Sequence, residues 1–266
     1  MSILETPLPQ PIITKMVNAL SVRVYEDAIA LAQDTAKIVQ DYLESILKEQ
    51  ETATIIFATG NSQLKFLDAL SELGGVEWSK IRLFHLDEYL GISANHPASF
   101  RCYLRQRVEN RVSPKVFHYL EGDALEPIQE CDRYTQLLHT QPIDLCFLGI
   151  GDNGHLAFNE PSVTYFSDRR SVKIVKLDEI TRQQQVNQGH FPTLDAVPDY
   201  ALTLTIPSIC QARKIVCLAP GKAKAKIIRR MLQGEISPSL PASILRQQSH
   251  ATLFLDQESA SLVEFN

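Results

Sequence analysis

Short apolar runs that alternate with longer segments of helical periodicity constrain the fold of this chain more than any other feature. The runs have the length and composition of buried strands and occupy residues 53–59, 81–86, 115–120, 143–150, 171–177, 201–206, 214–219 and 251–255. Apolar positions at helical spacing occupy residues 24–49, 61–73, 97–108, 127–139 and 221–234, and a polar helix is expected from Asp178. Because strands alternating with helices form parallel sheets covered on both faces, we predict an α/β fold with a mostly parallel sheet.

The length of the chain, 266 residues, permits one large α/β domain or two small ones. No internal repeat, low-complexity tract or linker rich in glycine, serine or proline divides it. We therefore predict an extended, proline-dotted leader over residues 1–20 and a single α/β domain over residues 21–266.

Composition excludes several classes of partner. The apolar fraction of 44% and charged fraction of 21% are ordinary for a soluble globular protein. A formal net charge of −5, without a lysine–arginine run, favours neither nucleic acid nor a membrane surface. No apolar stretch approaches the roughly 18 to 20 residues that span a bilayer, and the N-terminus lacks the pattern of a signal peptide. We predict a cytoplasmic protein.

The cysteines support that compartment. They are odd in number and form no C-x-x-C pair: Cys102, Cys131, Cys146, Cys210 and Cys217. Cys146 and Cys217 lie inside predicted strands, where a free thiol behaves as a small apolar side chain. We expect buried, reduced thiols rather than structural zinc or disulfides.

A glycine-rich turn over residues 149–154 follows one predicted strand and matches the G-x-G-x-x-G pattern of dinucleotide-binding proteins. That interpretation requires a helix of about three turns after the third glycine, but Pro161 interrupts the chain. Asp178 also lies further away than the ribose-binding acid at its usual spacing of about 20 residues. Alternatively, the glycines only permit a sharp turn, or they present Asp152, His155 and Glu160 to a substrate.

A second group of ionisable residues follows the strand 81–86. Alternation along a strand sends Asp87 and Glu88 to opposite sides, so only one of them should face a cleft. His85, Asp87 and His155 are conceivable metal ligands, but no recognised ligand spacing supports them. We predict no metal site.

Small polar residues follow the strand 53–59 at the start of a predicted helix: Thr59, Gly60, Asn61 and Ser62. Free backbone N–H groups and hydroxyls at such a position suit an anion such as phosphate. An ordinary N-cap by Asn61 or Ser62 is the alternative. One of the lysines after Gly221 could meet the same phosphate, although such lysines usually form a solvated face. Together these features predict a site for a small phosphorylated metabolite, with acid–base groups and no cofactor.

Three motifs closely resemble the signature stretches of the glucosamine-6-phosphate deaminases, a family that is related to the 6-phosphogluconolactonases. They read LDEYLG at 86–91, HPASF at 96–100 and GIGDNGHLAFNEP at 149–161. The similarity extends from residues 58–62 to Lys224 and the segment 241–256, so it covers nearly the whole chain. The AFNEP ending favours the deaminase branch. The resemblance implies a single-domain, Rossmann-like fold of the deaminase/isomerase type.

The resemblance also implies roles for individual residues. Asp87 would remove the C2 proton of an amino-sugar phosphate, and His155 would open the sugar ring with assistance from Glu160. Asn153 stands where one subgroup has an aspartate, and it would orient its neighbours by hydrogen bonding. Histidine suits proton transfer because its unperturbed pKa is near 6.5.

For phosphate, the resemblance implies the loop Thr59–Ser62 and Lys224, in preference to Lys222. Typical deaminases place a phosphate-binding arginine where this chain has residues 187–190, Asn-Gln-Gly-His. Either Arg182 substitutes for it from one helical turn earlier, or the substrate preference has changed.

The expected reaction converts glucosamine 6-phosphate and water to fructose 6-phosphate and ammonia, without metal or cofactor. A lactonase-type hydrolase, a galactosamine-6-phosphate isomerase and a non-catalytic sugar-phosphate sensor remain alternatives. The partner in each case is a small sugar phosphate. Monomer and homo-oligomer both stay open.

Overall fold

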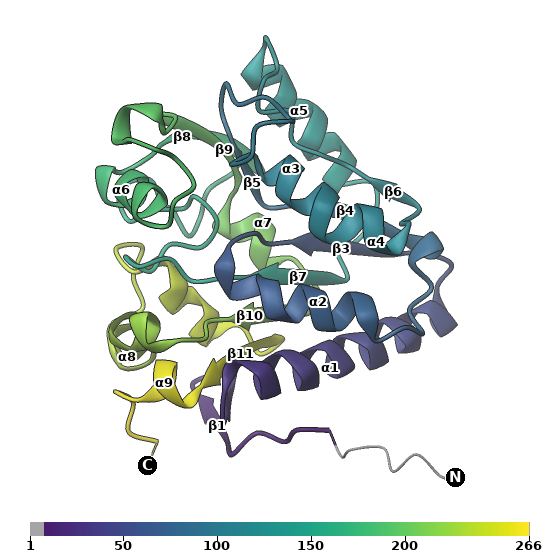
Figure 1. Cartoon of the computed structure of the whole chain (residues 1–266), viewed down its shortest axis with the longest axis vertical. Coiled ribbons are helices and arrows are strands. Elements are labelled where there is room, and N and C mark those ends of the chain that lie inside the picture. Colours follow the sequence, from purple (N-terminus) through teal and green to yellow (C-terminus); the bar gives the residue numbers. More distant parts are fainter. Residues whose placement is uncertain (1–7, 266) are drawn as a thin grey trace.

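The central sheet of the computed structural model, which describes residues 8–265, has the predicted mostly parallel architecture (Figure 1). Its eight strands lie in the order β1-β2-β11-β10-β7-β3-β4-β6. Their bounds are β1 (Ile13–Val17), β2 (Leu20–Tyr25), β3 (Ala53–Phe57), β4 (Ile81–His85), β6 (Val116–Phe117), β7 (Leu145–Leu148), β10 (Ile215–Leu218) and β11 (Ala251–Asp256). Every neighbouring pair is parallel except β1 with β2. The α/β prediction is confirmed.

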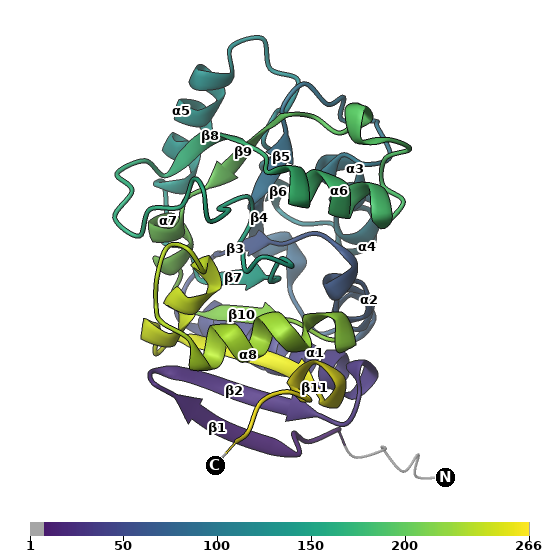
Figure 2. The same cartoon turned by 90° about the vertical axis from the view of Figure 1, so that its left-hand side faces the viewer.

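Helices pack on both faces of this sheet. Figures 1 and 2 show α1 and α2 on one side of the strands and α8 on the other. The helix bounds are α1 (Ala28–Glu49), α2 (Leu64–Glu72), α3 (Phe100–Leu104), α4 (Asn110–Val112), α5 (Pro127–Leu138), α6 (Glu179–Asn187), α7 (Ile206–Cys210), α8 (Ala225–Gln233) and α9 (Gln257–Ala260). The predicted helix 97–108 begins only at Phe100, because the side chain of Ser99 caps it by accepting from the Cys102 N–H. No helix of residues 8–265 is long and apolar enough to span a membrane.

A second, three-stranded sheet, which the sequence did not predict, contains two of the expected strands. It has the order β5-β9-β8, with β5 at Asp87–Tyr89, β9 at Tyr200–Leu204 and β8 at Val172–Lys176, all antiparallel. Leu86 is the residue between β4 and β5, and its carbonyl accepts from the N–H of Leu204 in β9. This sheet is therefore attached at the carboxyl end of β4, and Figure 1 shows it above the central sheet.

The predicted leader contributes to the sheet. Residues 1–7 lie outside the described part of the chain, but β1 pairs antiparallel with β2, with Ile13 opposite Val24. Among the described residues, the central sheet thus begins at Ile13, inside the segment predicted as a leader and before residue 21, the predicted start of the α/β domain.

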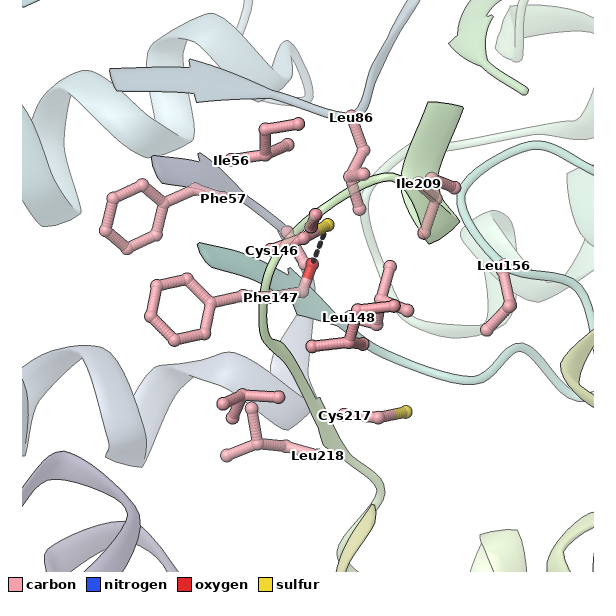
Figure 3. Packing of buried hydrophobic residues seen from close by; sticks show 14 of the residues in the cluster. Ile56, Phe57, Leu86, Cys146, Phe147, Leu148, Leu156, Ile209, Cys217 and Leu218 are labelled. Atoms are coloured by element: carbon pink, nitrogen blue, oxygen red, sulfur yellow. Dashed lines mark hydrogen bonds between the residues drawn. The ribbon is translucent and has the colours of Figure 1, made fainter. Parts of the chain in front are cut away.

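Close packing around β7 holds the middle of the sheet. Figure 3 shows Phe57 and Phe147 side by side, and their ring centroids are 5.0 Å apart. Cys146 and Cys217 are fully buried among these apolar side chains, and burial raises the pKa of both thiols. All five cysteines are free, while Cys102 and Cys210 are only partly buried. A rigid platform of this kind can fix the residues that follow each strand.

Candidate active site

The carboxyl ends of β3, β4, β7 and β10 meet at one edge of the central sheet, where ligands bind in open α/β folds. A cavity of about 180 Å³ lies there. It is lined by residues that follow these strands, among them Thr59, Gly60, Asn61, Ser62, Asp87, Gly151, His155 and Lys224. The structure thus brings together seven of the ten residues proposed for the site from sequence, with Gly151 from the glycine turn beside them.

Asp87 and Glu88 point in opposite directions, as the alternation predicts. Asp87 lines the cavity but is only 6% exposed. Burial, and secondarily the neighbouring Glu88 carboxylate, raises the pKa of Asp87 well above its usual range. Glu88 faces away and accepts from the Ser99 hydroxyl at 2.6 Å and the Arg101 backbone N–H at 3.0 Å. Asp87 is therefore the carboxylate available to a ligand, and its environment makes it a stronger base than a solvated one.

His85 contacts the backbone of Asp87, and both of its ring nitrogens form hydrogen bonds with backbone groups. Its Nε2 accepts from the Leu120 N–H at 2.8 Å, so Nδ1 carries the proton and donates to the Asp87 carbonyl at 2.9 Å. Burial lowers the pKa of His85 to about 3, which keeps the ring neutral. Within the described residues, no group of three or more His, Cys, Asp or Glu side chains could hold a metal ion.

His155 presents one ring nitrogen to the cavity. Its Nδ1 lies 2.8 Å from Oδ1 of Asn153, which also accepts from the His155 backbone N–H at 3.1 Å. An amide oxygen only accepts, so Nδ1 is the donor and Nε2 keeps a free lone pair. Burial, with a contribution from the Lys224 ammonium, lowers the pKa of His155 to about 4. At neutral pH the ring is uncharged and can take up a proton at Nε2. Asn153 does not line the cavity, and its side chain contacts this ring instead.

Gly151 leaves the space that the His155 ring occupies. A Cβ added at Gly151 would lie 2.1 Å from Nε2 of His155, too close for two non-bonded atoms. We therefore expect Gly151→Ala to displace the imidazole and to lower kcat/KM by about 10²-fold, the usual cost of misplacing a reacting group by about 1 Å.

The test of this prediction compares turnover and thermal unfolding in Gly151→Ala and Gly74→Ala. Gly74 is a useful control because an added Cβ there meets no atom within 4 Å, although its φ of 72° makes alanine slightly strained. Full activity of a folded Gly151→Ala protein would show that the ring position does not matter.

Glu160 lies behind the cavity and is fully buried. Its Oε2 accepts from the backbone N–H of Asp178 at 2.6 Å, directly before α6. Burial raises the pKa of Glu160 to about 7. Among the described residues, no hydrogen bond joins Glu160 to His155, so its position connects it to α6 instead.

The loop after β3 makes a sharp turn at Gly60 on the way into α2. Gly60 has a φ of 97°, a backbone conformation that glycine adopts without strain, and the turn Asn61–Gln63 follows it. No side chain caps this turn or the start of α2, which argues against the N-cap interpretation of Asn61 and Ser62. The Tyr103 hydroxyl donates to the Gly60 carbonyl at 3.1 Å and braces the loop.

A matching loop after β10 supplies the lysine. Gly221 has a φ of 93° and precedes the turn Lys222–Lys224, which leads into α8. Lys224 lines the cavity, whereas Lys222 is exposed and does not. The Nζ of Lys224 donates to Oδ1 of Asp152 at 2.7 Å. The choice of Lys224 over Lys222 therefore agrees with the geometry.

Arg182 occupies an environment different from the predicted one. It forms an ion pair with Asp199 at 2.9 Å and donates to the carbonyls of Leu194 and Val197 at 2.9 and 3.0 Å. Its guanidinium thus holds the segment after α6 and does not line the cavity. This finding corrects its assignment as the substitute phosphate ligand.

Uncharged side chains form the wall that the sequence did not predict. They come from α6 and the residues after it: Gln184, Gln185, Gln188 and His190. Their helical spacing was visible, but a polar helix without an apolar stripe gives no sign of which face meets a cavity.

This chain is similar to proteins of one known family over most of its length. A family model described as glucosamine-6-phosphate isomerases/6-phosphogluconolactonase matches residues 26–254. Glucosamine-6-phosphate deaminase 1 of Bacillus subtilis is 35% identical over 251 residues, covering 92% of this chain and 99% of that protein. The glucosamine-6-phosphate deaminase of Exiguobacterium sibiricum is 35% identical over 240 residues, covering 87% and 90%.

Solved structures agree. A structure described as a monomeric glucosamine-6-phosphate deaminase superposes with a TM-score of 0.83 at 35% identity, covering 91% of this chain and 99% of that one. A 6-phosphogluconolactonase from Shewanella baltica superposes with a TM-score of 0.74 at 19% identity, covering 91% and 100%. The second similarity extends to the fold alone.

Proposed function

This chain belongs to the glucosamine-6-phosphate isomerase/6-phosphogluconolactonase family, and we propose that it converts glucosamine 6-phosphate and water to fructose 6-phosphate and ammonia. The observation that carries the proposal is one cavity with three complementary groups. A desolvated carboxylate, Asp87, and a neutral imidazole, His155, share it with a glycine turn and Lys224, which suit a phosphate. Metal and cofactor are not required, because the open-chain aldehyde of the substrate acts as its own electron sink.

Ring opening is the step assigned to His155. Its free Nε2 takes the proton from the hydroxyl at C1 and returns a proton to the ring oxygen as the C1–O5 bond breaks. The hydrogen bond to Asn153 keeps the ring in the tautomer that this step needs. We assign Glu160 an indirect role in this step, through its hold on the start of α6.

Isomerisation is the step assigned to Asp87. The aldehyde acidifies the C2–H bond, and the carboxylate removes that proton to give an enol. Reprotonation at C1 leaves an imine at C2. Water adds to this imine, ammonia leaves, and the ketone of fructose 6-phosphate remains. The raised pKa of Asp87 suits a group that must both take and return a proton.

The test is ammonia release from a panel of glucosamine, galactosamine and mannosamine 6-phosphates, with 6-phosphogluconolactone as a separate substrate. We expect ammonia and fructose 6-phosphate in equal amounts from glucosamine 6-phosphate. Hydrolysis of the lactone without ammonia release from any amino sugar would favour the lactonase function instead.

We also expect turnover to persist after exhaustive treatment with EDTA and without a nicotinamide cofactor. The chemistry above uses only protein groups, and the described residues contain no cluster suited to a metal. Activity should be measured before and after removal of EDTA. Loss that one added metal restores would contradict the mechanism.

We further propose a cytoplasmic location, a proposal supported by the five free cysteines, since reducing compartments keep thiols unpaired.

A further inference from the structure

The Lys224 ammonium has an anionic partner within the protein itself. Its Nζ contacts Oδ1 of Asp152 at 2.7 Å. Asp152 belongs to the glycine turn after β7, whereas Lys224 follows β10, so the ion pair joins the two loops that border the cavity. The proposed function assigns no role to Asp152.

The other charges of the cavity make this pair important. Among the described residues that line the cavity, Lys224 is the one lysine or arginine, and Asp87 is the one acid. The facing wall consists of glutamine amides and His190, whose pKa burial lowers. A phosphate dianion would therefore depend on the single ammonium of Lys224 for charge compensation. That ammonium already forms an ion pair with Asp152.

The Asp152 side chain also has space to move away from Lys224. Its side chain is 48% exposed, whereas that of Lys224 is 16% exposed. Asp152 lines a second cavity of about 530 Å³, formed with Glu179 and other residues of α6. The carboxylate can thus turn toward solvent and replace its contact with Lys224 by hydration, while Lys224 stays at the substrate cavity.

We propose that Asp152 is an internal competitor for phosphate, because it pairs with the Lys224 ammonium and must be displaced when a phosphate binds there. Asp152 is then an affinity-determining residue of the reaction. This inference rests on the proposed function for the identity of the phosphate ligand. It predicts that Asp152→Asn tightens phosphate binding, because asparagine keeps the shape of the side chain and removes its charge.

The expected gain is two- to fivefold, the range that corresponds to a solvent-accessible ion pair. Calorimetric titration of inorganic phosphate into the full-length wild type and Asp152→Asn gives the dissociation constants directly. Glu179→Gln is the matched control, because Glu179 lines the same second cavity but forms no ion pair with Lys224. The control should bind phosphate as the wild type does. In a Lys224→Ala background, the gain from Asp152→Asn should disappear.

Several outcomes would overturn the inference. The first is an Asp152→Asn variant that binds phosphate no better than the wild type, including the case where neither protein binds it. The second is an equal gain in phosphate affinity in Glu179→Gln. The third is a gain in affinity from Asp152→Asn that persists in the Lys224→Ala background. The titration does not depend on turnover. Failure of the wild type to release ammonia from any hexosamine 6-phosphate would contradict the proposed function, and the phosphate titration would still decide the role of Asp152.

Discussion

Asp87→Asn should lower kcat by about 10²–10⁴-fold, the contribution typical of a general base, while fructose 6-phosphate still binds. Asparagine preserves the size of the side chain, but its amide cannot take the C2 proton. The Asp87 carboxylate is buried at the carboxyl end of β4, so no solvated side chain substitutes for it easily. The measurements are ammonia release and calorimetric binding of fructose 6-phosphate.

Asp132→Asn is the control for this prediction, since Asp132 is an exposed acid on α5 that does not line the cavity. It should retain full activity. Near-wild-type turnover by a folded Asp87→Asn protein would remove Asp87 from the mechanism.

The pH dependence of kcat/KM provides a second readout of the same carboxylate. Asp87 must be ionised to act as a base, and burial raises its pKa above the usual value near 4. Activity should therefore rise with pH through this raised pKa. An acid limb no higher than that of a solvated aspartate would mean that desolvation does not tune the base.

Lys224→Ala should raise KM for glucosamine 6-phosphate by about 10- to 150-fold, which corresponds to a charge-assisted contact of roughly 1.5–3 kcal/mol. Lys224 is the one lysine or arginine among the described residues lining the cavity, so its loss leaves only backbone N–H groups, hydroxyls and uncharged amide and imidazole groups for the phosphate. Steady-state kinetics with glucosamine 6-phosphate measure the effect.

Lys222→Ala, two residues earlier in the same turn but exposed, is the matched control and should change KM little. An unchanged KM in Lys224→Ala would mean that the phosphate is bound elsewhere.

The sequence predicted six strands of the central sheet, because each of them is a buried apolar run next to a helical pattern: β3, β4, β6, β7, β10 and β11. It did not predict β1 and β2, and α1 begins at Ala28 and not at residue 24 because Val24 and Tyr25 belong to β2. It did not separate β8 and β9 from that sheet, since runs such as VKIVK and YALTL have the same composition whichever sheet they join. Strand partners depend on contacts between distant segments. Here β9 belongs to the second sheet because it pairs with β5, the strand that directly follows β4 along the chain.

The site was predictable where it follows strands, because the carboxyl ends of parallel strands meet at one edge. Asp87, His155 and Lys224 all conform to that rule. Arg182 did not, since its ion pair with Asp199 depends on how the segment after α6 folds back. The structural role of His85 was likewise hidden, because its Nε2 accepts from the backbone of Leu120, far along the chain.

The most direct test of the central claim uses glucosamine 6-phosphate carrying deuterium at C2, followed by NMR and an ammonia assay. With the wild type, we expect deuterium to leave C2 and fructose 6-phosphate and ammonia to form in equal amounts. With Asp87→Asn, we expect neither. Retention of deuterium at C2 by a wild-type protein that binds the sugar, or its loss at an equal rate in Asp87→Asn, would contradict the central claim.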